Sequence, residues 1–384
     1  MEPVVLGIIA EYNPMHNGHI HHLAAARAAS AADFVVAVMS GDFVQRGRPA
    51  VLDKWTRAKL AAEQGIDLVL ELPAAYAVNS AEYFARGAMA ILKKSRVVTH
   101  VGFGYEGEDP ALLSEVAQAR RSAAYKEALQ EVLGQETYAR AHHAVLAGIL
   151  GEEAAETASL PNNILAALYL EEMEDLIPVP IERDTAYAPA SWIRQQYTDG
   201  KMTLREAPVP YEVAKALEDW DTDVESPLLA IVRSRILTAS AEDLSQVFGM
   251  TEGLEQRLKK VVREGGDWES LLTAAGTKRY TRAALSRLLI QIAIDMKKDV
   301  LGANRGLLPG YGRVLAIGRK GRELIRLWQQ DEWALPLITK VDKDTDDPLL
   351  QLDMRAADVY NLARGADLYE DSDLVRHPYV MQDE

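Results

Sequence analysis

The stretch Gly7–Ile20, which reads GIIAEYNPMHNGHI, decides the fold that the sequence predicts. It begins in a short apolar run of strand type, turns at Asn13-Pro14, and continues into an alanine-rich segment, residues 18–30, that has a helical pattern. A buried strand that turns directly into a helix is the first half of a crossover unit, which belongs to a parallel sheet. We therefore predict an α/β fold whose first strand is Val4–Ala10.

Strand and helix patterns alternate along the first half of the chain. The further predicted strands are Asp33–Met39, Asp67–Leu72, Val97–Phe103 and Val179–Glu182. The predicted helices between them are Lys54–Gln64 and a helix from the N-cap Ser80 to Lys94. This alternation predicts a Rossmann-like parallel sheet, in which ligands bind beyond the carboxyl ends of the strands. The polar segments at those ends are Asn13–His19, Ser40–Arg46, Glu71–Pro73 and Gly102–Glu106.

Two other parts of the chain have a different pattern. Residues 109–160 are rich in Ala, Glu and Gln, and we predict helices inserted before the fifth strand. Strand patterns fade after about residue 205, and residues 212–339 are predicted to be mostly helical. A length of 384 residues suits two domains. We expect a first domain in residues 1–205, built on the parallel sheet, and a mostly α-helical second domain in residues 206–384.

Composition excludes several classes of protein. The chain has no cysteine, which rules out disulfides, thiolate catalysis and a Cys-based zinc site. There is neither a signal-peptide pattern nor an apolar run of about 20 residues, so we expect a cytoplasmic protein without a membrane span. The net charge of −15 argues against non-specific coating of nucleic acid, although a local basic face is compatible with it. The sequence does not indicate an oligomeric state.

The strongest chemical signal is the pair His16 and His19 at the predicted start of the first helix. Free amides and the dipole at a helix start favour a phosphate, and Gly18 allows close approach to the backbone. Imidazoles three residues apart lie on one side of a helical turn, where they can donate to phosphate oxygens during transfer at an α-phosphorus. The alternative is a surface turn with two unrelated histidines. A zinc site is disfavoured because only His21 and His22 are nearby as further ligands.

The segment Gly7–Ile20 resembles the signature of the HIGH nucleotidyltransferase superfamily. Other segments, spread over nearly the whole chain, resemble the family of bacterial tRNA(Met) cytidine acetate ligases: Met39–Ala50, Lys54–Arg57, Asp67–Pro73, Pro161–Leu165, Thr277–Thr281 and Tyr311–Leu315. The resemblance implies that ATP, normally with Mg²⁺, and acetate form acetyl-adenylate and pyrophosphate. The acetyl group would then pass to N4 of the wobble cytidine of elongator tRNA(Met).

The resemblance also implies which residues bind ATP. His16 and His19 would hold the triphosphate, as catalytic residues. The loop contacts would be Gly7, Ile8, Ile9, Ala10, Glu11, Tyr12, Asn13, Pro14, Met15, His16, Asn17, Gly18, His19 and Ile20. The contacts outside the loop would be Gly104, Asn162, Asn163, Arg183 and Arg194, of which Arg194 is also a catalytic candidate.

Several of these assignments have a structural alternative. Gly104 fits a plain turn equally well, and one of Asn162 and Asn163 is expected to cap a helix while the other reaches the nucleotide. Pro189 stands where the family usually has a serine, which weakens the expected phosphate contact there. Arg194 remains available as a bidentate phosphate clamp. Asp42 is a further catalytic candidate, with a loop ion pair as the equal alternative.

The predicted helical domain contains a basic stretch. Residues 255–299 hold ten Lys and Arg against six Asp and Glu, with aromatic residues nearby. The resemblance places Lys278, Arg279 and Arg282 near tRNA, whereas a solvated helix face is the alternative. Two other functions stay open, namely a small-molecule cofactor adenylyltransferase and a non-catalytic nucleotide-sensing RNA-binding protein. Acetate is ionised at neutral pH and needs no base to attack phosphorus, and no base for the second step is evident.

Overall fold

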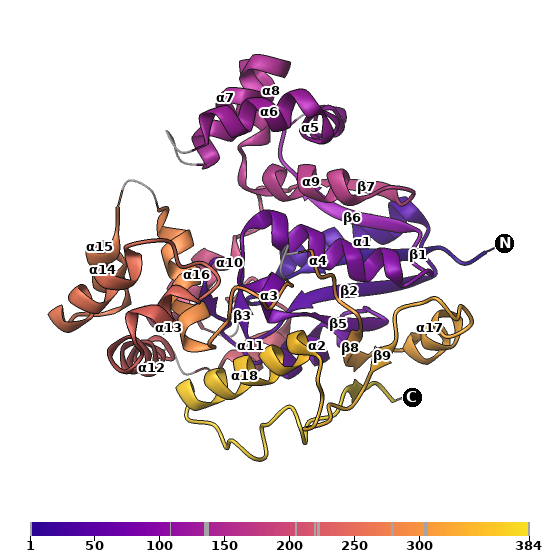
Figure 1. The fold of residues 1–384 in the computed structure, drawn as a ribbon. Helices are drawn as coiled ribbons and strands as arrows, with labels where there is room; N and C mark the ends of the chain where they lie inside the picture. Colours follow the sequence, from indigo (N-terminus) through magenta and orange to yellow (C-terminus); the bar gives the residue numbers. More distant parts are fainter. Residues whose placement is uncertain are drawn as a thin grey trace.

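A sheet of eight strands forms the centre of the computed structural model, which describes residues 2–107, 109–133, 138–203, 206–218, 220, 223–277, 280–302 and 306–382 (Figure 1). The strand order is β10-β8-β5-β2-β1-β6-β7, and β9 pairs with β8. The strands are β1 (Val5–Ala10), β2 (Phe34–Ser40), β5 (Leu68–Leu72), β6 (His100–Tyr105), β7 (Ile177–Glu182), β8 (Gly312–Ile317), β9 (Leu337–Ile338) and β10 (Tyr379–Val380). A separate hairpin consists of β3 (Phe43–Val44) and β4 (Arg48–Pro49).

The five strands predicted from the sequence, β1, β2, β5, β6 and β7, all pair in parallel, which confirms the Rossmann-like α/β class. β1 lies between β2 and β6, so the loop that follows β1 leaves the sheet near its middle. β6 begins three residues later than predicted. Ser95 Oγ accepts hydrogen bonds from the backbone N–H groups of Val97 and Val98, which holds that segment in a turn before the strand.

β8 is a strand that the sequence did not predict. It pairs antiparallel with β5, with a register shift between Val69 and Leu70, and all six of its residues are buried. A short apolar run that is buried on both sides has no period to distinguish a strand from a helix segment. Residues 206–384 are mostly helical, as predicted, but they also contain β8, β9 and β10, which the fading strand patterns did not reveal.

Helices cover both faces of the sheet, because alternate residues of each strand point to opposite faces. The helices of the first half outside the insertion are α1 (Asn17–Ser30), α2 (Lys54–Glu63), α3 (Ala74–Ala77), α4 (Ala81–Lys94), α9 (Pro161–Glu172) and α10 (Ala190–Thr198). In β2, Val35 and Ala37 belong to one core with α1 and α2, whereas Val36 and Val38 belong to the other core with α3, α4 and α9. None of the described helices is long and apolar enough to cross a membrane.

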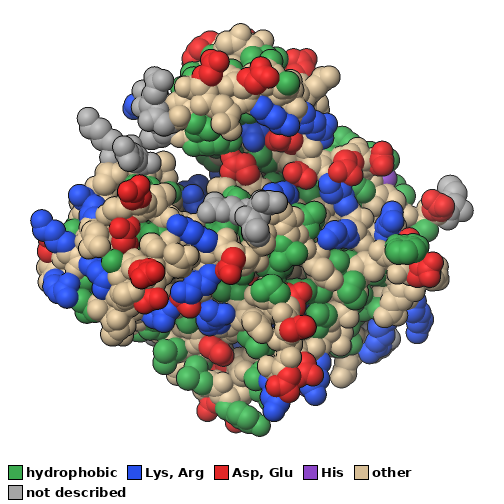
Figure 2. Space-filling view, viewed as in Figure 1, with side chains coloured by type: hydrophobic (Ala, Val, Ile, Leu, Met, Phe, Trp, Pro, Cys, Tyr) green, Lys and Arg blue, Asp and Glu red, His purple; other side chains and the backbone are tan. Residues whose placement is uncertain are grey.

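The predicted helical insertion before β7 is present. It comprises α5 (Ala111–Arg121), α6 (Ala123–Val132), α7 (Tyr138–Leu150) and α8 (Glu152–Ala158). These helices form a small core of their own with Val116, Leu146 and Ala155. They stand out from the body of the molecule above α9 (Figures 1 and 2).

The remaining helices lie to the left of the sheet, below it and at its right in Figure 1. They are α11 (Tyr211–Glu218), α12 (Glu225–Thr238), α13 (Ala241–Ser245), α14 (Leu254–Val261), α15 (Trp268–Ala275), α16 (Arg282–Ala293), α17 (Gly321–Trp328) and α18 (Pro348–Ala363). Residues of α12–α18, such as Leu228 and Tyr360, share one continuous core with β2 and β5. The helical region α12–α16 is therefore packed directly onto the half of the chain that forms the parallel sheet.

Candidate nucleotide-binding site

The loop between β1 and α1 is held by hydrogen bonds from three other parts of the chain. The Asn13 side chain accepts from the backbone N–H of Val51 at 2.8 Å, and the Asn13 carbonyl accepts from Arg194 Nη1 at 2.5 Å. Arg57 Nη1 donates to the Glu11 carbonyl at 2.6 Å. These contacts fix the loop before any ligand arrives.

His16 and His19 form a reciprocal cap at the start of α1. His16 Nδ1 accepts from the Gly18 N–H at 3.1 Å, and His19 Nδ1 accepts from the His16 N–H at 3.2 Å. The ring centroids lie 3.8 Å apart. Because each Nδ1 is an acceptor, each neutral ring carries its proton on Nε2. Both side chains therefore offer an Nε2–H donor from one side of the helix start.

Burial keeps both imidazoles neutral. It lowers the pKa of His16 to about 4, with a smaller contribution from Arg183, and it lowers the pKa of His19 well below its ordinary value, with contributions from His16 and His22. Donation from Nε2 does not require a charged ring, so the pair can bind phosphate oxygens at neutral pH. An anion would favour protonation of either ring and strengthen the contact.

Two glycines of the loop have different roles. A Cβ on Gly18 would lie 2.9 Å from the His16 ring and 3.1 Å from Tyr187, so Gly18 allows the cap to form. A Cβ on Gly7 would lie 2.9 Å from the Leu92 side chain. Gly7 therefore serves the packing of α4 against β1, at the buried beginning of the predicted ATP-binding stretch.

Gly104 and the two asparagines lie together where β6 meets α9. A Cβ on Gly104 would have no atom within 4 Å, so open space lies beside this strand end. Asn163 is fully buried and its amide is used, since it accepts from Glu106 N–H at 2.8 Å and donates to the carbonyls of Glu106 and Thr157 at 2.7 and 2.9 Å. The half-buried Asn162 side chain makes no hydrogen bond within the described residues.

The two arginines of the predicted site lie on either side of the loop. Arg183 pairs with Glu106 at 3.4 Å and lies close enough to His16 to lower the pKa of that ring. Arg194 is half-buried, and burial lowers its pKa while the nearby Glu11 raises it. Pro189 is the N-cap residue of α10, and its side chain accepts no hydrogen bond from the first backbone N–H groups of that helix.

Asp42 belongs to a different set of contacts. Its Oδ1 accepts from the Lys54 N–H at 2.9 Å, and its Oδ2 lies 3.8 Å from Lys54 Nζ. Burial raises the pKa of Asp42 to about 6, although Lys54 opposes that effect. The Asp42 carboxylate therefore contacts buried groups in the interior of the protein, below the loop that follows β2.

That interior holds a buried ion cluster, which we define as Asp42, Lys54, Glu71, Arg313 and Asp373. Lys54 Nζ lies 2.8 Å from Glu71 and 2.7 Å from Asp373, and Arg313 Nη1 lies 3.1 and 2.7 Å from the same two carboxylates. All five residues are at most 4% exposed. The cluster ties β5, α2, β8 and the segment before β10 together.

Sequence reasoning did not single out Arg57, which is 1% exposed. Besides the Glu11 carbonyl, its guanidinium donates to the carbonyls of Ser40, Gly41 and Leu52. It therefore joins the carboxyl ends of β1 and β2 below the loop. The sequence did hold one sign of this role, because Arg57 lies among the residues that α2 buries.

The hairpin β3–β4 connects the loop to the helical region. On one side, the Gln45 N–H donates to Glu11 Oε1 at 2.6 Å. On the other, Ser286 Oγ of α16 donates to the Gly47 carbonyl at 2.7 Å, and a Cβ on Gly47 would lie 2.2 Å from the Arg287 nitrogen. Arg48 pairs with Glu225 and Glu269 of the same region.

Many basic residues of the helical region are used internally. Lys259 Nζ donates to the carbonyls of Ile236 and Ala239 at the end of α12, and Arg257 donates to carbonyls at the end of α15. Arg282, with a side chain 57% exposed, pairs with Glu269. Lys278 and Arg279 lie outside the described residues. Lys and Arg side chains are interspersed with Asp and Glu over these helices (Figure 2).

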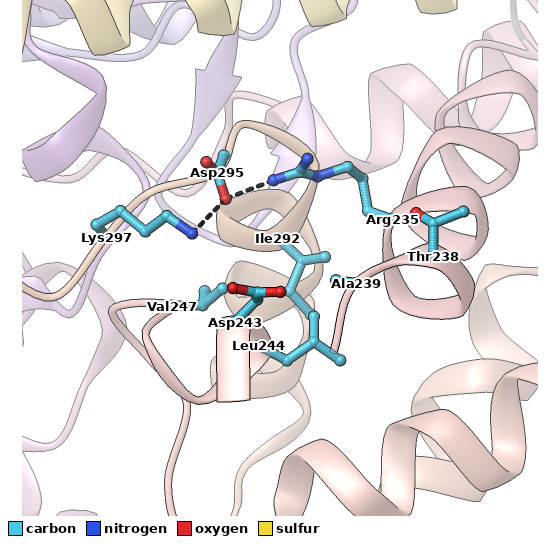
Figure 3. A pocket seen from close by; sticks show the side chains of 9 residues that line it. All are labelled: Arg235, Thr238, Ala239, Asp243, Leu244, Val247, Ile292, Asp295 and Lys297. Atoms are coloured by element: carbon cyan, nitrogen blue, oxygen red, sulfur yellow. Dashed lines mark ion pairs between the residues drawn. The ribbon is translucent and has the colours of Figure 1, made fainter. Parts of the chain in front are cut away.

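A cavity of about 370 Å³ lies within the helical region and contains none of the predicted site residues. Its lining comes from α12, α13 and the end of α16: Arg235, Thr238, Ala239, Asp243, Leu244, Val247, Ile292, Asp295 and Lys297. Figure 3 shows Asp295 between Arg235 and Lys297, and Lys297 Nζ lies 2.9 Å from its carboxylate. Three of its charged groups, Arg235, Asp295 and Lys297, are thus paired with one another, and Asp243 accepts a hydrogen bond from Ser240 Oγ.

Known proteins share this architecture over almost the whole chain. A family model described as HIGH Nucleotidyl Transferase matches residues 4–373. The tRNA(Met) cytidine acetate ligase of Caldanaerobacter subterraneus subsp. tengcongensis is 34% identical over 93% of this chain and 95% of that one. The tRNA(Met) cytidine acetate ligase of Leuconostoc citreum is 34% identical over 97% of this chain and 96% of that one. The crystal structure of Thermotoga maritima TmcAL bound with alpha-thio ATP matches with a TM-score of 0.87 at 28% identity, over 98% of this chain and 99% of that one. The chain therefore belongs to the tRNA(Met) cytidine acetate ligase family of HIGH nucleotidyltransferases.

Proposed function

We propose that this chain is an ATP-dependent ligase that joins acetate to N4 of the wobble cytidine of elongator tRNA(Met), in the cytoplasm. The observation that carries the proposal is the pair of Nε2–H donors of His16 and His19 at the start of α1, in a chain of this family. A relative of the same fold binds an ATP analogue, as its name says. These donors suit the triphosphate of ATP.

In the first step, a carboxylate oxygen of acetate attacks the α-phosphorus of ATP. An O–P bond forms, the bond to the pyrophosphate oxygen breaks, and acetyl-adenylate and pyrophosphate result. The catalytic contribution is positioning and charge stabilisation, which His16 and His19 supply on the phosphate side together with Arg183 and Arg194. Mg²⁺ enters with ATP, because it binds mainly through phosphate oxygens and water.

The open space beside Gly104 is where we place the adenosine, with Asn162 as the asparagine that contacts it. Asn163 instead holds the end of β6 in place through its three hydrogen bonds. Asp42 has a structural role in this scheme, because its contacts lie within the buried ion cluster.

The tRNA would lie against the helical region, with Lys278, Arg279 and Arg282 as phosphate contacts. Arg282 is exposed at the start of α16, and the hairpin β3–β4 connects that helix to the ATP loop. Phosphate contacts of this kind are sensitive to salt, so binding should weaken as ionic strength rises.

The test is pyrophosphate exchange into ATP, with and without acetate, followed by nucleoside mass spectrometry of elongator tRNA(Met) after incubation with ATP and acetate. Exchange that requires acetate, together with N4-acetylcytidine in this tRNA and not in a tRNA with a wobble uridine, is expected. Exchange that requires a different acceptor would indicate a cofactor adenylyltransferase. No exchange, even with tRNA present, would indicate a nucleotide-sensing protein.

A further inference from the structure

Glu11 is the only acidic residue in the loop Gly7–Ile20. The residue is half-buried just after β1, and its Oε1 accepts from the Gln45 N–H at 2.6 Å. Its own carbonyl accepts from Arg57 Nη1 at 2.6 Å. The carboxylate is therefore fixed in the loop that carries the two histidines, and one hydrogen bond leaves acceptor capacity on the group.

Within the described residues, four ionisable side chains lie close enough to Glu11 to interact with it electrostatically. They are Arg57 from α2, Arg194 from α10, Arg46 from the loop between β3 and β4, and Tyr169 from α9. Burial raises the pKa of Glu11, and the three arginines and a backbone N–H lower it by less. A carboxylate with a raised pKa is a stronger base than an ordinary glutamate.

The first chemical step has no use for such a base, because acetate is already ionised at neutral pH. The second step does need one. The exocyclic nitrogen of cytosine carries protons, and one of them must leave when the nitrogen becomes an amide.

We propose that Glu11 is the general base of the acetyl-transfer step, an inference that rests on the proposed function. N4 of the cytosine attacks the carbonyl carbon of acetyl-adenylate, and a C–N bond forms. One N4 proton moves to a carboxylate oxygen of Glu11. The bond between the carbonyl carbon and the phosphate oxygen breaks, and AMP leaves with the electron pair.

A purely structural role predicts different behaviour. If Glu11 only anchored the hairpin β3–β4, Glu11→Gln would be harmless, because the amide oxygen can still accept from the Gln45 N–H. Glu11→Ala would then impair both chemical steps by freeing the hairpin. Glu11→Gln therefore removes basicity while it keeps the anchor.

The experiment measures the two steps separately on the full chain. Acetate-dependent pyrophosphate exchange, without tRNA, reports the first step. Single-turnover transfer of labelled acetate to elongator tRNA(Met), at saturating ATP, reports the second. Because Glu11 also belongs to the loop expected to contact ATP, the two rates are compared within one variant: Glu11→Gln is expected to slow transfer at least about 10²-fold more than it slows exchange, a typical contribution of a general base. Glu115→Gln, exposed on α5, is the control for loss of one negative charge.

The dependence on pH gives a second readout. Transfer by the wild type should rise with pH through one ionisation above the ordinary range of glutamate, because the base must be deprotonated. Glu11→Gln should lose that rise. If Glu11→Gln slows transfer no more than it slows exchange, the role of Glu11 as the base is overturned while the proposed function stands. Absence of acetate-dependent exchange in the wild type would overturn the proposed function as well.

Discussion

The loop Gly7–Ile20 and the buried ion cluster lie at the same edge of the sheet, yet they use their polar groups in opposite ways. In the cluster, every charge has an oppositely charged neighbour within 4 Å and almost no exposure to solvent. In the loop, the histidines use Nδ1 to cap α1 and keep Nε2–H for a partner. The charges of the cluster are buried and paired with one another, and they join elements of the fold, whereas a polar group that keeps a donor toward the site can bind a ligand.

The largest effect we expect is on stability, from Lys54→Met. The substitution leaves three buried carboxylates with Arg313 as the remaining cation among the cluster's members, and the free energy of unfolding should fall by about 3–5 kcal/mol. Urea denaturation measures it. Lys59→Met, on the same helix but with a side chain 52% exposed, is the control and should cost less than about 1 kcal/mol. Equal costs for the two variants would contradict the comparison.

The largest effect on activity should come from the loop, with His16→Asn. Asparagine is a good N-cap, so the helix start is kept while the imidazole donor is lost. The rate of acetate-dependent pyrophosphate exchange should fall by about 10²–10³-fold, as when one transition-state donor is removed. His143→Asn, in the inserted helices, should leave the rate unchanged. A variant that exchanges normally would show that this imidazole does not act on phosphate.

Asn162 and Asn163 offer the same contrast between a polar side chain that is hydrogen-bonded within the protein and one that can bind a ligand. Asn163→Ala leaves the N–H and carbonyl of Glu106 without their partner and should lower the free energy of unfolding by about 1–3 kcal/mol. Asn162→Ala should leave stability nearly unchanged and weaken ATP binding about fivefold, the value of one hydrogen bond of about 1 kcal/mol. Calorimetric titration with ATP measures the second effect. If Asn162→Ala lowered stability and Asn163→Ala weakened ATP binding, Asn163 and not Asn162 would be the nucleotide contact.

The last prediction concerns the dependence of stability on pH. Folding holds the pKa of His16 at about 4, against an ordinary value of 6.5, so the unfolded chain binds the proton first as pH falls. The free energy of unfolding should therefore decrease from pH 6.5 towards pH 4, and His16→Asn should lessen that decrease. Urea denaturation at pH 7 and pH 5 tests this. An unchanged slope would show that His16 is not held neutral by burial.

Local patterns predicted the central part of this fold, because β1, β2, β5, β6 and β7 each carry an apolar run next to a turn or helix signal. The histidine cap is local too, since its partners lie within three residues. The ion cluster was beyond reach because its members come from residues as far apart as 42 and 373. The choice between Asn162 and Asn163 was equally hidden, because it depends on where Glu106 lies in three dimensions.

The hairpin β3–β4 has a thermodynamic consequence. Its Gln45 N–H donates to Glu11 in the loop Gly7–Ile20, and its Gly47 carbonyl accepts from Ser286 of α16, so neither end can move without loss of a hydrogen bond. Any factor by which ATP alters the affinity for RNA through this hairpin must equal the factor by which RNA alters the affinity for ATP. Two dissociation constants, each measured with and without the other ligand, would give that coupling free energy.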